Sequence, residues 1–304
     1  MDEPERREAA ENAPALVQLR QRVTGHAEAI RLACVWEATA AKVGNVHPTA
    51  AFADCDYADF CQAASAIAPV LAGASSEPPA EQARPTNVSS PPLGDRVLAA
   101  IRATHAVTAA NVNLGIVLLI APLAMARDRG DVRRVLAELT PEDGAKVYRA
   151  IALAGAGGLD SDPVDPRWDV ATAAPATIDL IAAMRLARDR DRIARQYADD
   201  FGDFFDNVLP VVQAELTAID DIGEAIVRAQ LKLLAAEPDS LILRKCGPSV
   251  AAEVCRRAAA CVGEQGGDRP QRESLDRWLR AAGNRRNPGT TADLIAAALY
   301  WLIR

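Results

Sequence analysis

Residues 14–41 read PALVQLRQRVTGHAEAIRLACVWEATAA, and KVGNVHP follows at once as residues 42–48. Apolar side chains in the first stretch recur at helical spacing. They are Leu16, Leu19, Val23, Ala27, Ile30 and Cys34. The spacing predicts one helix from about Pro14 to Ala41. The second stretch ends it, because Gly44 can take positive φ and Pro48 cannot continue a helix.

The same periodicity dominates the rest of the chain. We expect further helices near 57–72, 94–109, 113–127, 131–138, 141–155, 174–199, 201–216, 219–236, 248–263, 270–282 and 290–303. No segment alternates like a strand, and aromatic residues make up only 4% of the chain. The apolar run from Leu114 to Ala126 is shorter than the roughly 20 residues of a membrane span, so it predicts a buried core helix. The fold class is therefore all-α, a single globular multi-helix domain with buried central helices.

Composition excludes several functional classes. The chain has 304 residues and a net charge of −7, which argues against non-specific nucleic-acid binding. Its six cysteines form no CxxC pair, and no signal-peptide pattern opens the sequence. We therefore expect a reduced, cytoplasmic protein with no membrane partner. Residues 1–13 are expected to be a disordered tail of the domain at 14–304, and the Pro- and Ser-rich residues 74–93 an exposed loop.

Five polar junctions interrupt the apolar pattern and could carry chemistry. The first is the segment 42–48 with Glu37 before it, which on its own also suits a simple helix C-cap. The second is 104–115, where Asn111 and Asn113 precede Gly115 and an apolar helix. Either these asparagines cap that helix or they belong to a ligand site at its N-terminus.

The other three junctions are also open to two interpretations. Residues 185–197 alternate arginine and aspartate, which indicates a salt-bridged face or phosphate-binding arginines such as Arg188 beside a magnesium ligand such as Asp189. Residues 239–247 place Arg244 and Lys245 beside a glycine. Residues 287–294 feed the last helix and put Asp293 in its first turn, where a carboxylate is also stabilised by the helix dipole.

The five segments together resemble the triphosphoribosyl-dephospho-coenzyme A synthases. Glu37-Ala…Lys42-Val-Gly-Asn-Val is similar to the family's Glu-Ala…Lys-Pro-Gly-x-Val, with Asp54 and Asp56 as its acidic segment. Thr108-Ala-Ala-Asn-Val-Asn-Leu-Gly115 resembles Thr-x-x-Asn-Thr-His-Lys-Gly. Asp239 to Gly247 resembles Asp-Thr-x-x-x-x-Arg-x-Gly, and Asn287-Pro-Gly-Thr-Thr-Ala-Asp-Leu294 resembles Ser-Pro-Gly-Gly-Ser-Ala-Asp-Leu. The resemblance covers roughly residues 30–303.

The chain departs from the family's pattern at its central motif. Asn113 and Leu114 stand where the family has histidine and lysine, and the Arg-Gly-Glu-Ala segment is not found at 165–170. The sequence looks more like a divergent branch of the family, as in archaea and methanopterin-using bacteria. The fold is expected to survive these changes.

The resemblance implies the reaction and its site. ATP would donate its 5-triphosphoribosyl group to the 2′-hydroxyl of 3′-dephospho-CoA and release adenine, with Mg²⁺ on the triphosphate. We expect three catalytic residues: Glu37, His47 and Asp54. Magnesium is expected on Glu37, Asp54 and Asp189. The nucleotide-binding residues are expected to be Lys42, Asn45, Asn111, Asn113, Arg188, Arg244 and Asp293. The alternative is a repurposed nucleotide-binding protein serving tetrahydromethanopterin-linked one-carbon metabolism, and the sequence leaves a homodimer open.

Overall fold

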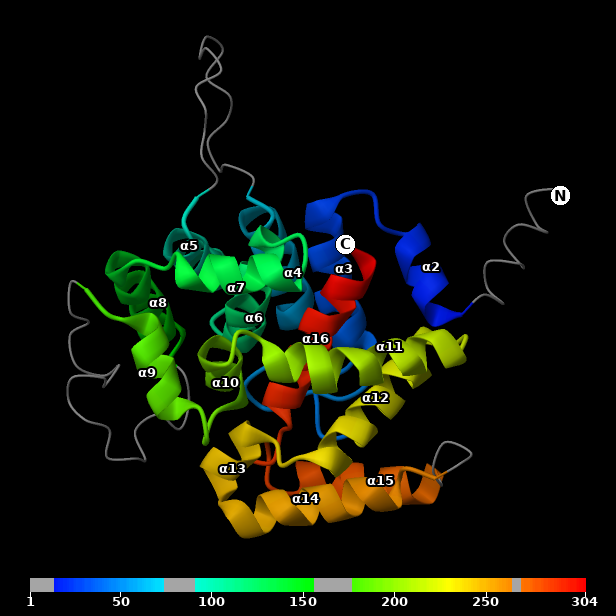
Figure 1. Cartoon of the computed structure of the whole chain (residues 1–304). Helices are drawn as coiled ribbons and strands as arrows, with labels where there is room; N and C mark the ends of the chain where they lie inside the picture. Colours follow the sequence, from blue (N-terminus) through cyan, green and yellow to red (C-terminus); the bar gives the residue numbers. More distant parts are fainter. Residues whose placement is uncertain (1–13, 74–90, 156–176, 264–268) are drawn as a thin grey trace, which may run out of the picture.

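The computed structural model describes residues 14–73, 91–155, 177–263 and 269–304, and within these ranges the regular elements are helices (Figure 1). The elements of the first half are α2 (Ala15–Gln21), α3 (His26–Thr39), α4 (Tyr57–Leu71), α5 (Leu93–His105), α6 (Leu114–Met125), α7 (Arg129–Ala137) and α8 (Pro141–Ala154). Those of the second half are α9 (Leu180–Ala187), α10 (Arg192–Ala198), the π-helical turn Phe204–Val208, α11 (Leu209–Ala218), α12 (Ile222–Ala236), α13 (Ser240–Cys246), α14 (Pro248–Ala260), α15 (Arg269–Arg280) and α16 (Gly289–Ile303). The all-α prediction is confirmed.

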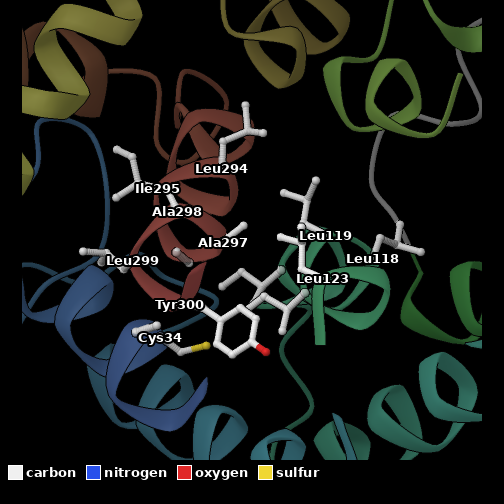
Figure 2. Packing of buried hydrophobic residues seen from close by; sticks show 14 of the residues in the cluster. Cys34, Leu118, Leu119, Leu123, Leu294, Ile295, Ala297, Ala298, Leu299 and Tyr300 are labelled. Atoms are coloured by element: carbon white, nitrogen blue, oxygen red, sulfur yellow. The ribbon is translucent and has the colours of Figure 1, made fainter. Parts of the chain in front are cut away.

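Two apolar helices, α6 and α16, lie at the centre of the fold. α16 packs against α3, α6, α11 and α12. Nearly every residue of α16 from Thr290 to Ile303 is buried, and so is α6 from Gly115 to Leu123. Figure 2 shows Leu119 and Leu123 of α6 beside Ala297 and Tyr300 of α16. The predicted buried central helices are therefore confirmed, and the run at 114–126 is a core helix.

The first predicted helix is wrong in one respect, because it is two helices. α2 ends at Gln21, and α3 begins only after Gly25, whose backbone is extended. α2 docks separately: the Ala15 N–H donates to the carbonyl of Ile219, and the Arg20 guanidinium donates to the carbonyl of Leu302. These contacts with distant segments orient α2 separately from α3. The break between the two helices therefore could not be predicted from local periodicity.

Side-chain caps divide two other predicted segments. The helix expected at 174–199 is interrupted because the Asp191 carboxylate accepts from the N–H groups of Ile193 and Ala194 and starts α10. The junction expected at 239–247 contains the short helix α13, which the Asp239 carboxylate caps in the same way. The helix expected at 201–216 begins instead with the π-helical turn and continues as α11.

Some expectations fall outside the described residues. The predicted tail at 1–13 and residues 74–90 of the predicted loop lie there, as do residues 165–170. Among the residues that are described, none of the helices combines the length and the apolar character that crossing a membrane requires.

Candidate active site

Helix ends from both halves of the chain surround a cavity of about 760 Å³, which is within the range of small-molecule sites. All five polar junctions contribute to its wall. The contributing residues are Glu37 and Asn45 from the first junction, Asn111 and Asn113 from the second, Arg190 and Asp191 from the third, Arg244 and Lys245 from the fourth, and Asn287 and Asp293 from the fifth. Segments far apart in the sequence therefore meet at one site.

The loop after α3 owes its shape to Gly44. This glycine has a φ of +71°, and a Cβ here would lie 2.8 Å from Cδ1 of Leu279. Its N–H donates to the Asp276 carboxylate at 2.8 Å. The positive φ that the sequence suggested is confirmed, and it turns the chain so that Asn45 reaches the cavity.

Asn45 links the first and last junctions beneath the cavity. Its amide nitrogen donates to the Asn287 side chain at 2.6 Å, and its amide oxygen accepts from Gln230 at 2.7 Å. Gln230 also bonds both backbone groups of Val43. With both amide atoms engaged, Asn45 positions the wall of the site.

Lys42 does not line the cavity. Its ammonium is fully buried behind Glu37, 2.8 Å from the carboxylate, and it also donates to the Glu37 carbonyl. Glu37 is the member of the pair that lines the cavity. The expected nucleotide contact of Lys42 is therefore not seen, because a buried ammonium needs a buried anion and finds it at the end of α3.

The central junction supplies amides to the cavity. Asn113 precedes α6 but does not cap it with its side chain; its amide exchanges hydrogen bonds with the Thr104 hydroxyl at 2.9 and 3.1 Å. Asn111 is exposed at the cavity wall. The two asparagines therefore differ, since Asn113 is committed to Thr104 whereas Asn111 makes no side-chain hydrogen bond within the described ranges.

Asp293 packs against Gly115 at the start of α6. A Cβ on Gly115 would lie only 2.0 Å from Oδ2 of Asp293, so this contact requires a glycine. The Asp293 carboxylate is half-buried at the cavity and makes no hydrogen bond or ion pair within the described part of the chain. Burial raises the pKa of Asp293 well above its usual range, and the charges of Glu37, Asp239 and Asp191 raise it further.

Two cations lie on α13 at the cavity. The Arg244 guanidinium donates to the Asp191 carboxylate at 3.1 Å, while its buried Nε finds no partner among the described residues. The Lys245 ammonium likewise makes no ion pair there. Burial lowers the pKa of Lys245, and the neighbouring Arg244 lowers it further.

Counting from Asp239 corrects the alignment of this segment. The arginine of the family's Asp-Thr-x-x-x-x-Arg-x-Gly falls at Lys245, and Arg244 occupies the preceding variable position. Lys245 was therefore missed as a site residue, although it stood in the quoted motif. Asp239 itself joins the fourth and fifth junctions, because its carboxylate accepts from the N–H and hydroxyl of Thr291, both at 2.8 Å.

Asp54 lies on the exposed rim of the cavity. Its carboxylate accepts from the Asn284 amide at 2.5 Å. The neighbouring Cys55 also lines the cavity, but burial raises the pKa of its thiol to about 11, with Asp54 adding to the rise. Cys55 therefore stays protonated at neutral pH. Asn284 was missed because nothing around it in the sequence marks a ligand contact.

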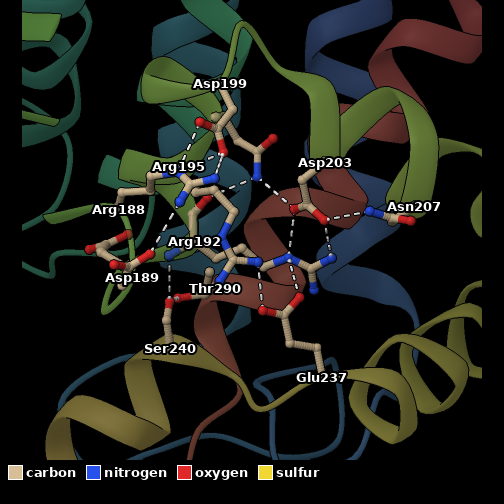
Figure 3. Close-up of polar contacts among 12 residues, drawn as sticks. Arg188, Asp189, Arg192, Arg195, Asp199, Asp203, Asn207, Glu237, Ser240 and Thr290 are labelled. Atoms are coloured by element: carbon tan, nitrogen blue, oxygen red, sulfur yellow. Dashed lines mark hydrogen bonds and ion pairs between the residues drawn. The ribbon is translucent and has the colours of Figure 1, made fainter. Parts of the chain in front are cut away.

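Arg188 and Asp189 are not brought to the cavity. The Arg188 guanidinium is half-exposed and pairs with Asp199 at 2.8 Å and with Asp189, whose side chain is 93% exposed (Figure 3). The next arginine, Arg192, is buried against Asp203 at 2.8 Å. The salt-bridged interpretation therefore describes Arg188, Arg192 and Arg195. The charged residues that this segment gives to the cavity are Arg190 and Asp191.

His47 lies outside the cavity too. It lines an open groove between the loop after α3, α12 and α15, together with charged residues such as Asp276 and Arg280. Burial lowers its pKa, and Arg280 lowers it further. The geometry does not favour an acid or base role for His47 in the cavity.

The three expected magnesium ligands are not assembled. Glu37 and Asp54 line the cavity, but Asp189 lies on the surface. No group of three or more metal-ligating side chains occurs within the described residues. Magnesium on a nucleotide needs only one or two protein carboxylates beside the phosphates. Glu37 and Asp54, the two expected ligands that line the cavity, would meet that requirement.

Comparisons with known proteins identify the family and the fold of this chain. The model of the CitG family, described as ATP:dephospho-CoA triphosphoribosyl transferase, matches residues 24–303. A solved structure of a proposed triphosphoribosyl-dephospho-CoA synthase from Archaeoglobus fulgidus is 23% identical, with a TM-score of 0.56. The alignment covers 81% of this chain and 96% of that one, which shows a shared fold. A search of curated proteins finds no match.

Proposed function

The chain belongs to the ATP:dephospho-CoA triphosphoribosyl transferase family, and on that premise we propose the reaction that it catalyses. The 5-triphosphoribosyl group of ATP passes to the 2′-hydroxyl of 3′-dephospho-CoA, and adenine is released. One observation carries the proposal. The five segments that resemble the family's motifs line a single cavity, where cations of α13 and an unpartnered carboxylate of α16 converge.

Arg244 and Lys245 are the proposed triphosphate ligands. Both line the cavity, and each keeps donor capacity that the described residues do not use. Desolvated cations bind phosphate oxygens more strongly than exposed ones, because water competes less. Burial lowers the pKa of Lys245. The negative charge of a bound triphosphate would raise this pKa again and so keep the ammonium charged.

Glu37 and Asp293 are the proposed groups at the ribose. In the transfer, the C1′–N9 bond breaks and the acceptor oxygen bonds to C1′, which becomes positively charged in between. The acceptor hydroxyl loses one proton and the departing adenine gains one. A carboxylate near C1′ stabilises the developing charge. Asp293, whose pKa burial and neighbouring carboxylates raise, suits the donation of a proton to the departing adenine.

Asn111 and Asp54 are the proposed polar contacts to the sugars. The amide of Asn111 is free for a ligand, whereas Asn45 and Asn113 hold the wall in place through their own hydrogen bonds. Mg²⁺ bound to the triphosphate would neutralise its charge, and the cavity-lining carboxylates Glu37 and Asp54 would hold it.

A second candidate function rests on the central junction. Asn113 is committed to Thr104 and Leu114 is apolar, so this junction gives the cavity no titratable side chain. That favours a protein that binds the nucleotide without transferring its ribose, for example in methanopterin-linked one-carbon metabolism. Thermal shift with magnesium-ATP tests for a retained nucleotide site, since a ligand of the folded state raises stability.

Chromatography of adenine then separates the two candidates. Purified protein with magnesium-ATP and dephospho-CoA should release adenine, and either substrate alone should release none. A thermal shift with ATP but no adenine at high protein concentration would favour the binding function.

A further inference from the structure

One cavity residue has a polar group that the proposed chemistry does not use. Tyr148 of α8 lines the cavity and is 6% exposed. Its hydroxyl makes no hydrogen bond within the described residues. The other three tyrosines of the chain all have partners: Tyr57 bonds Thr39 at 2.7 Å, Tyr197 donates to the Leu118 carbonyl at 2.7 Å, and Tyr300 bonds His26 at 2.5 Å.

An unpartnered hydroxyl on a buried side chain calls for a partner. Buried tyrosines usually have a hydrogen-bond partner for the hydroxyl. The Tyr148 oxygen is not among the fully buried polar atoms that lack a partner, so it is accessible to one from outside the protein. Tyr148 lines the cavity, so a ligand bound there can supply the partner. Burial raises the pKa of Tyr148 to about 12, which keeps the hydroxyl protonated and able to donate at neutral pH.

The wall around Tyr148 is apolar. Ile151 follows it one turn later on α8, and α9 contributes Ala183, Met184 and Ala187. No charged lining residue comes from α8 or α9. The charged ones come from α3, the loop that holds Asp54, the segment between α9 and α10, α13 and α16. The lining that α8 and α9 contribute therefore carries none of the groups proposed for phosphate and ribose.

We propose that this wall is the adenine subsite and that the Tyr148 hydroxyl recognises the ring edge. The proposal rests on the proposed function, which brings two adenine rings to the cavity, one in ATP and one in dephospho-CoA. A purine ring presents flat apolar faces and acceptor nitrogens at its edge. The aliphatic and thioether side chains of α8 and α9 contact the faces, and the hydroxyl donates to a ring nitrogen.

Substitution of Tyr148 by phenylalanine tests the subsite. The variant keeps the ring and loses only the hydroxyl, so the fold is retained. Calorimetry is done with four probes: magnesium-ATP, dephospho-CoA, adenosine and inorganic tripolyphosphate. We expect Tyr148→Phe to weaken the binding of adenosine and of one of the two substrates by roughly 3- to 10-fold, which corresponds to the loss of one hydrogen bond. Tripolyphosphate, which has no base, should bind as it does to the wild type.

The substrate whose binding weakens is the one whose adenine ring Tyr148 contacts. Tyr57→Phe is the matched control, since Tyr57 does not line the cavity, and it should change none of the four affinities. Unchanged adenosine, ATP and dephospho-CoA binding in Tyr148→Phe overturns the subsite, as does an equal loss for tripolyphosphate. Because binding is measured without turnover, a protein that binds adenosine through Tyr148 but releases no adenine would keep the subsite and contradict only the proposed reaction.

Discussion

Lys42 and Glu37 form an ion pair inside the protein, with 2.8 Å between Nζ and Oε1 and both side chains almost fully buried. The ammonium also donates to the Glu37 carbonyl. Lys42 therefore fixes the end of α3 and holds the Glu37 carboxylate at the cavity wall. This relationship makes Lys42 a positioning residue, whereas the sequence suggested a direct phosphate contact.

Removal of Lys42 alone should destabilise the protein strongly. Lys42→Met leaves the Glu37 carboxylate buried without its cation, which costs about 3–5 kcal/mol in comparable buried pairs. The free energy of unfolding, measured in denaturant, checks this. The double variant Lys42→Met with Glu37→Gln should recover most of the loss. A single variant as stable as the wild type would contradict the buried pair.

Gly115 should tolerate no side chain while Asp293 is present. Gly115→Ala places a Cβ 2.0 Å from Oδ2 of Asp293, which is far too close for two unbonded atoms. The carboxylate therefore has to move away from its position in the site. We expect loss of adenine release, measured by chromatography. Gly202→Ala is the control, because no atom lies within 4 Å of its added Cβ. Full activity in Gly115→Ala would show that the position of Asp293 is unimportant.

Asp293 should make stability depend on pH in a defined direction. Its folded pKa is raised, whereas the unfolded chain ionises near the usual value of about 4. The folded state then retains a proton that the unfolded state has lost, so stability falls as pH rises from about 4 towards the folded pKa.

Asp293→Asn removes this pH-dependent loss. We expect its melting temperature to exceed that of the wild type at pH 8 but not at pH 4, while adenine release is abolished. Thermal unfolding at the two pH values checks the first expectation. A variant less stable than the wild type at pH 8 would show that the carboxylate is ionised and stabilised in the fold.

The cations of α13 should matter for ATP, and Arg188 at the end of α9 should not. Lys245→Met and Arg244→Met remove proposed phosphate contacts, so we expect ATP binding to weaken by about 10-fold or more. Arg188→Met is the matched control, since its ion pair with Asp199 is on the surface and contributes under about 1 kcal/mol. Calorimetry with magnesium-ATP measures all three. An equal loss in Arg188→Met would refute the assignment.

The helical class of the fold could be predicted because apolar spacing is a local signal. α6 and α16 show it most strongly, and both lie at the centre. The breaks could not be predicted, because they depend on distant partners. α2 is held by Ile219 and Leu302, about 200 to 300 residues further along the chain.

The site could be located from the sequence but not resolved into roles. Polar junctions marked the segments that meet at the cavity, since unpaired helix ends gather where loops converge. Which side chain faces inward depends on packing. Lys42 pairs with Glu37 and Arg188 pairs with Asp199, whereas Lys245 forms no ion pair among the described residues and lines the cavity. Tyr148 carried no sequence signal, because a tyrosine in a helical pattern looks like any core residue.

Mass spectrometry of the acceptor tests the central claim most directly. The protein is incubated with dephospho-CoA and magnesium-ATP labelled with ¹³C at all five ribose carbons, and the CoA product is isolated. The proposed transfer gives a product that has gained a triphosphoribosyl group with all five labelled carbons, formed in step with free adenine. Unmodified dephospho-CoA after incubation with a protein shown to bind ATP would contradict it.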